Sequence, residues 1–68
     1  MLESTALHGG KEIMAYTGRR WKILLEWHKE LHFPMIELNG AWESDTALID
    51  TWRREQILRV SEEKWKSL

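Results

Sequence analysis

The sequence contains no cysteine, a single proline and no long apolar run. Without cysteine, neither a disulfide framework nor a thiolate metal site can form. The missing apolar run argues against a signal peptide or a membrane span, and we expect a reducing, cytoplasmic setting. Neither sign of charge dominates, because ten basic and eleven acidic residues give a net charge of −1. This balance argues against nucleic-acid binding by bulk charge alone.

The chain is rich in tryptophan. Its 68 residues are enough for one small domain, which buries a smaller share of its surface than a larger domain does. Five tryptophans compensate for the small size, since each buried aromatic side chain removes roughly 150–250 Å² from water. The helical and hairpin spacing around Trp27, Trp42 and Trp52 predicts that these three belong to the core.

The first helix is predicted over residues 11–17. Ile13 and Tyr16 lie three residues apart and therefore share one face. The pair Gly9-Gly10 breaks the chain before this helix, and Gly18 ends it as a residue in the left-handed conformation.

A second helix is predicted over about residues 20–31, after a tight turn at Gly18. Pro34 forbids its continuation and pushes the preceding residue toward extended geometry. Two helices joined by such a turn form a helix-turn-helix unit. The apolar residues that form its buried stripe, at steps of three and four, are Ile23, Leu24, Trp27 and Leu31.

Residues 35–44 are predicted to form a β-hairpin. Asn39-Gly40 is a strong turn signal, because both residues tolerate positive φ. These elements together predict a mainly α protein with a small β-hairpin.

The register of this hairpin has two alternatives. A two-residue loop opposes Leu38 to Ala41 and places Trp42 on the face away from Ile36 and Leu38. A bulged loop opposes Leu38 to Trp42 and buries both. We favour the bulged register because it buries a tryptophan. The residues that this register turns outward are Glu37 and Glu43.

A third helix is predicted over about residues 45–59, with a possible extension toward the C-terminus. Ser44 is its expected N-cap, and the charge of Asp45 suits the positive end of the helix. The residues expected on or beside its buried stripe are Leu48, Ile49, Trp52 and Gln56.

The predicted domain organisation has three parts. Residues 1–10 are a leader or a short edge strand, residues 11–57 are the folded domain, and residues 58–68 are a helical extension or tail. An apolar stripe in the tail either packs back on the domain, frays or forms a homodimer. Its members are Leu58, Trp65 and Leu68.

An ordered series of motifs resembles the MerR-like, excisionase-type winged helix-turn-helix family. The series consists of Lys11-Glu12-Ile13, Tyr16, Gly18, Trp27, Pro34, the run Ile36-Glu37-Leu38-Asn39-Gly40-Ala41-Trp42, then Ser44-Asp45, Ile49-Asp50 and Trp52. The resemblance covers about residues 7–52 and is more specific for fold than for role. The DNA-binding part of phage terminase small subunits is similar to this series too.

The resemblance implies a non-catalytic protein that binds double-stranded DNA, either a phage or prophage excisionase or transcription regulator or, alternatively, a DNA-packaging component. Its second helix would enter the major groove, and the hairpin would be a wing that touches the backbone or the minor groove. No cofactor and no small-molecule substrate is implied. The DNA-contacting positions would be Arg20, Trp21, Lys22 and Leu25 on the helix, Asn39, Gly40 and Ala41 at the wing tip, and Arg19 in the turn.

The chain departs from the family pattern at two places. Arg19 and Arg20 stand where the family has an aliphatic residue and then a Ser or Thr cap, so charge is gained and the cap is lost. The family wing is usually basic, whereas Ala41 replaces a basic residue here and Glu37 and Glu43 flank the turn. A protein-interaction module that has lost DNA binding is therefore the alternative hypothesis.

Two other features have competing interpretations. Trp21 lies off the apolar stripe, so that it either contacts DNA or covers the edge of the first helix. His28 and His32 are four residues apart, but no third ligand is evident and no metal site is predicted. The sequence has no acid–base pair, nucleophile motif or phosphate loop that would indicate an enzyme.

Overall fold

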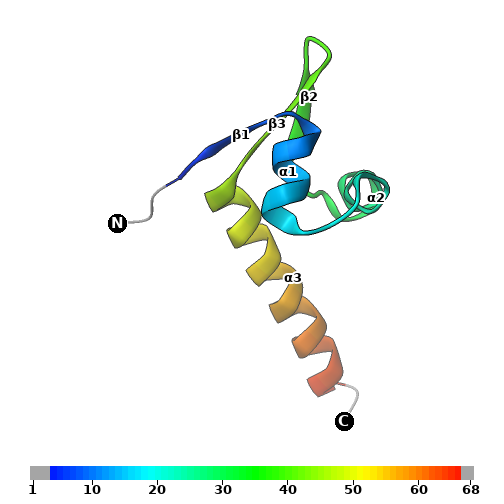
Figure 1. Ribbon diagram of the computed structural model, residues 1–68. Helices are drawn as coiled ribbons and strands as arrows, with labels where there is room; N and C mark the ends of the chain where they lie inside the picture. Colours follow the sequence, from blue (N-terminus) through cyan, green and yellow to red (C-terminus); the bar gives the residue numbers. More distant parts are fainter. Residues whose placement is uncertain (1–3, 67–68) are drawn as a thin grey trace.

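Three helices and a small three-stranded antiparallel sheet make up the computed structural model (Figure 1), which describes the backbone of residues 4–66 and the side chains of residues 4–62. The prediction of a mainly helical protein with a small β component is confirmed. The elements, in chain order, are β1 (Ala6–His8), α1 (Gly9–Thr17), α2 (Trp21–Leu31), β2 (Met35–Leu38), β3 (Ala41–Asp45) and α3 (Thr46–Lys66).

The first two helices end as the sequence indicates, although α1 begins earlier than predicted. Gly9 and Gly10 form the first turn of α1 and do not break the chain before it. Gly18 follows the helix at φ 69°, and its N–H donates to the Met14 carbonyl at 2.8 Å. Helix α2 ends at His32, a non-glycine residue with φ 58°. Pro34 follows two residues later, where it cannot continue the helix.

The hairpin has the two-residue loop, so the predicted bulged register is wrong. Leu38 pairs with Ala41, and Asn39 and Gly40 form the loop with φ values of 51° and 83°. Positive φ at both loop positions matches the right-handed twist of the two strands. The turn chemistry of Asn39-Gly40 therefore decides the register. Strand β1 pairs with the other side of β3, so that the strand order is β1-β3-β2.

This register still places Trp42 on the inner face of the sheet. Trp42 and Ser44 are two residues apart on β3 and therefore share one face of the sheet. Met35 and Leu7, the residues that pair with Ser44, are buried on this same face. The outer face receives Ile36, which is 56% exposed, and Leu38 near the loop. The expectation that Leu38 and Trp42 share a buried face is wrong for this reason.

Asp45, and not Ser44, caps α3. The Asp45 Oδ2 atom accepts hydrogen bonds from the N–H groups of Ala47 at 3.0 Å and Leu48 at 3.3 Å. Ser44 is one residue too early, since it lies in β3 and its hydroxyl donates to the Pro34 carbonyl. A hydrogen bond from the Ser4 hydroxyl and those from the helix N–H groups hold the pKa of Asp45 below its usual value.

The core lies between α1, α2, the sheet and the start of α3. The prediction that Leu31 and Leu48 belong to this core is wrong, because both side chains are exposed. Trp27, Trp42 and Trp52 are half-buried around it, and the Trp52 Nε1–H donates to the Leu31 carbonyl at 2.8 Å. The buried side chains of the core are Leu7, Ile13, Leu24, Phe33, Met35 and Ile49.

Helix α3 continues past the predicted end and extends away from the rest of the domain (Figure 1). Leu58 is 62% exposed, so it does not pack back on the domain. The side chains of Trp65 and Leu68, the other members of the predicted stripe, lie outside the described residues. Within the described part of the chain, no helix combines the length and the apolar character that crossing a membrane requires.

Candidate nucleic-acid interface

The turn between α1 and α2 presents the N-terminus of α2 without a side-chain cap. Arg20 occupies the N-cap position with an extended backbone, and its carbonyl accepts from the N–H groups of Ile23 at 3.0 Å and Leu24 at 3.1 Å. Its side chain makes no capping hydrogen bond. The first turn of α2 is therefore without a side-chain cap from its N-cap residue at the positive end of the helix, where an anion is favoured.

Helix α2 has one buried side and one exposed side. Leu24 is fully buried, and its neighbour Leu25 is 37% exposed. Lys22, Leu25 and Lys29 are exposed at steps of three and four residues, which places them along one side of the helix. Among residues 4–62, neither Lys22 nor Lys29 makes an ion pair. Relative to the described residues, this side therefore offers two unpaired ammonium groups with an apolar residue between them.

Lys29 was not among the predicted contact residues. It lies seven residues after Lys22, which is two turns of the helix. That spacing is the sequence signal that would have identified it. Glu26 is exposed beside these lysines and limits the net positive charge of the side.

Arg19 lies in the turn before α2. Its guanidinium carbon is 5.9 Å from the ring centroid of Trp27. Trp27 packs in turn against Trp52 of α3, with ring centroids 5.3 Å apart. Arg19 therefore makes a cation–π contact with an aromatic ring that also packs against α3.

Trp21 covers the edge of α1, which was one of its two predicted roles. A Cβ atom added to Gly10 would lie 3.0 Å from Trp21 Cζ3, so the indole ring is in close contact with the first turn of α1. The other side of Trp21 packs edge-on against Trp42, at a centroid distance of 5.4 Å. These contacts fix the start of α2 against both α1 and the hairpin.

The predicted wing residues lie at the tip of a hairpin that extends beyond the helices (Figure 1). Asn39, Gly40 and Ala41 are all exposed there. The hairpin is joined to α2 through Trp42, which also contacts the ring of His28 edge-on at a centroid distance of 5.4 Å. Helix α2 and the hairpin are thus packed together by side chains of the inner sheet face.

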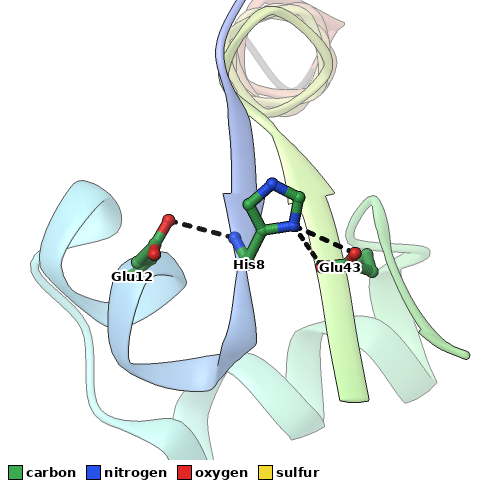
Figure 2. A network of polar contacts seen from close by, with 3 residues as sticks. All are labelled: His8, Glu12 and Glu43. Carbon is green, nitrogen blue, oxygen red and sulfur yellow. Dashed lines mark hydrogen bonds and ion pairs between the residues drawn. The ribbon is translucent and has the colours of Figure 1, made fainter. Parts of the chain in front are cut away.

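The two glutamates that flank the turn in sequence have different environments. Glu37 is exposed close to the tip. Glu43 is farther down the strand, where both of its carboxylate oxygens lie 3.0 Å from the Nδ1 atom of His8 (Figure 2). The carboxylate of Glu43 raises the pKa of His8, through this hydrogen bond first and through its charge second. Glu12 completes the group by accepting from the backbone N–H of His8 at 3.0 Å.

The two histidines of α2 have separate roles in the structure. The His28 Nδ1 atom lies 3.2 Å from the Phe33 carbonyl oxygen, and His32 is the residue at which the helix ends. Within residues 4–62, no group of three or more potential ligands is placed to hold a metal ion.

Comparison of the chain with protein-family models, with curated proteins and with solved structures finds no match. Any functional inference therefore depends on the geometry of the residues described above.

Proposed function

We propose that this protein binds double-stranded DNA, and that α1, α2 and the hairpin form a winged helix-turn-helix. The exposed side of α2 would enter the major groove, with the hairpin tip on the neighbouring backbone. The observation that carries the proposal is the division of α2: Leu24 is fully buried, while Lys22, Leu25 and Lys29 are exposed along the other side.

The residues of this side suit the chemistry of a DNA surface. Arg20 and Lys22 are exposed at the N-terminal end of α2, where they would neutralise phosphates or donate to the acceptor edge of guanine. Leu25 would provide an apolar contact, for which a thymine methyl group is a suitable partner. No bond is made or broken in such a complex, so we propose a non-catalytic role.

The first experiment measures binding to duplex DNA directly. A fluorescently labelled duplex of random sequence is titrated with the protein at about 50 mM and about 200 mM salt, and anisotropy is recorded. We expect binding at low salt and a steep loss at high salt, because each neutralised phosphate releases condensed counterions. Replacing Arg20 and Lys22 by Glu should abolish the low-salt binding.

A matched control separates contact from total charge. The double variant Arg53→Glu/Arg54→Glu reverses two exposed charges on α3 and changes the net charge by the same amount. It should bind far better than the Arg20→Glu/Lys22→Glu variant. No binding at low salt, or an equal loss in both variants, would contradict the proposal.

The biological role is a sequence-based hypothesis, with excision, transcription regulation and DNA packaging as its alternatives. The genomic neighbourhood distinguishes them, since an adjacent integrase gene favours excision and a large terminase gene favours packaging.

A protein-interaction module is the second candidate function. It is favoured by the outer face of the hairpin, where Ile36 and Leu38 are exposed and Glu43 lies opposite Ile36. A protein of this kind would fail the anisotropy test at low salt. It would instead retain a protein partner in a pull-down at moderate salt.

A further inference from the structure

The exposed side of α2 has a carboxylate at its centre. Leu24 marks the buried side of this helix, because its side chain is fully buried. Lys22 and Glu26 each lie two residues from Leu24, which is about 200° around the helix in either direction. Both are exposed and project almost directly away from the core. A partner that meets Lys22 along this side therefore meets the carboxylate of Glu26 as well.

The carboxylate of Glu26 is not paired with the lysines of the same helix. Lys22 precedes Glu26 by four residues and Lys29 follows it by three, and residues at these spacings are neighbours on a helix surface. Within residues 4–62, the structure nevertheless joins neither lysine to Glu26 in an ion pair. Both oxygens of Glu26 are therefore available as hydrogen-bond acceptors for a partner outside the chain.

The same side of α2 is close to neutral. The positive charges of Lys22 and Lys29 are balanced by the negative charges of Glu26 and Glu30, and all four side chains are exposed. Arg20 adds a positive charge at the N-terminal end. Attraction to phosphates is therefore modest, and tight binding of DNA requires contacts with base edges as well. Glu26 is better placed for such a contact than Glu30, because recognition helices contact bases mainly with their N-terminal residues.

We propose that Glu26 determines sequence specificity by accepting a hydrogen bond from the N4 amino group of a cytosine in the major groove. This inference rests on the proposed function, in which α2 enters that groove. A carboxylate has acceptors only, so it matches the amino donor of cytosine and is repelled by the acceptor edges of guanine and thymine. Adenine is a poorer partner than cytosine, because its N7 acceptor lies beside its amino donor. Lys22, about one turn earlier, would donate to guanine, so that a G·C pair offers partners to both side chains.

The experiment compares the DNA sequences that the unmodified chain and Glu26→Gln prefer. Each protein selects duplexes from a library of random sequence at about 50 mM salt. Anisotropy titrations then measure the Kd of each protein for the selected duplex, and for duplexes that carry each of the other base pairs at one position. Glu30→Gln is the matched control, since it removes the same charge from the next turn of α2. Both glutamates are exposed, so neither variant should change the thermal unfolding of the chain.

We expect one position at which the unmodified chain prefers C·G by at least about tenfold, since a single mismatched base pair weakens binding by about 5- to 150-fold. Glu26→Gln should shift that preference to A·T, because Gln can both accept from adenine N6 and donate to adenine N7. Glu30→Gln should tighten binding to every duplex by a similar factor and leave the preference unchanged.

Three results overturn the inference while the proposed function stands. They are a bound DNA with no C·G preference at any position, a C·G preference that Glu26→Gln retains, and a preference that Glu30→Gln loses to the same extent. In the second case, tighter binding of Glu26→Gln to all duplexes alike would mean that the carboxylate acts through its charge alone. If the unmodified chain binds no duplex at low salt, the proposed function itself fails, and the inference fails with it.

Discussion

Adjacent leucines in α2 provide a sharp test of which side of the helix is buried. Leu24 is fully buried and Leu25 is 37% exposed, although the two differ in sequence by one position only. Leu24→Ala should destabilise the fold by about 2–5 kcal/mol, since it removes buried methyl groups and leaves a cavity. Leu25→Ala should cost about 1 kcal/mol or less, because water fills the space that the side chain leaves.

The difference between these two stability losses is large compared with the total stability expected for this protein. At about 0.05–0.15 kcal/mol per residue, a chain of this length has a total stability of roughly 3–10 kcal/mol. A loss of 1 kcal/mol lowers the Tm of a domain this small by about 4–8 °C. Leu24→Ala should therefore lower the Tm by at least about 8 °C, or leave the chain unfolded.

Thermal unfolding followed by circular dichroism measures both variants. In the DNA titration the order reverses, because Leu25→Ala should weaken binding while leaving the fold intact. If Leu25→Ala costs as much stability as Leu24→Ala, the orientation of α2 described above is wrong, and so is the interface built on it.

Two further predictions concern the turn and the sheet. Gly18→Ala should destabilise the fold by about 1–2 kcal/mol in urea titration, because φ at this position is 69° and a Cβ atom is strained there; a variant as stable as the unmodified chain would refute the assigned turn. The pKa of His8, followed by NMR titration of the imidazole C–H signals, should lie above its usual value and fall in Glu43→Gln. Since the folded pKa is raised, the pair contributes stability below about pH 6.5 that is lost as pH rises through the folded pKa; an unchanged pKa in Glu43→Gln would contradict the contact.

Much of the helical fold follows from local signals in the sequence. Gly18 and Pro34 set the end of α1 and the limit of α2, because φ preferences and the missing proline N–H act within a few residues. The buried position of Leu24 follows from the helical period. The end of α3 was harder to predict, since no glycine or proline interrupts the chain after Asp45.

The errors arose where two local signals competed. In the hairpin, burial of Trp42 beside Leu38 favours the bulged register, whereas the loop geometry of Asn39-Gly40 favours the two-residue loop. The structure satisfies both by turning Ile36 outward, an outcome that an apolar pattern alone does not indicate. Ser44 and Asp45 are both good capping residues, and only the pairing of Ser44 with β1 and β2 assigns the cap to Asp45.

The candidate site was predictable in its position but not in its orientation. The turn, the start of α2 and the hairpin tip follow from spacing. The side-chain directions of Arg19 and Trp21 depend on partners distant in sequence. Arg19 contacts Trp27, which packs against Trp52 of α3. Trp21 packs against Trp42 of the hairpin. Such partners are set by tertiary packing, which spacing within one helix does not encode.

The one-sided packing of α2 has a consequence for how this chain diverges over evolution. The aromatic contacts of Trp21 and Trp27 hold the helix from one side only. Substitutions at Lys22, Leu25 and Lys29 therefore escape most of the selection that maintains folding. Descendants of this chain can exchange those residues and change the chemistry of this exposed side, while the scaffold that presents it is inherited unaltered.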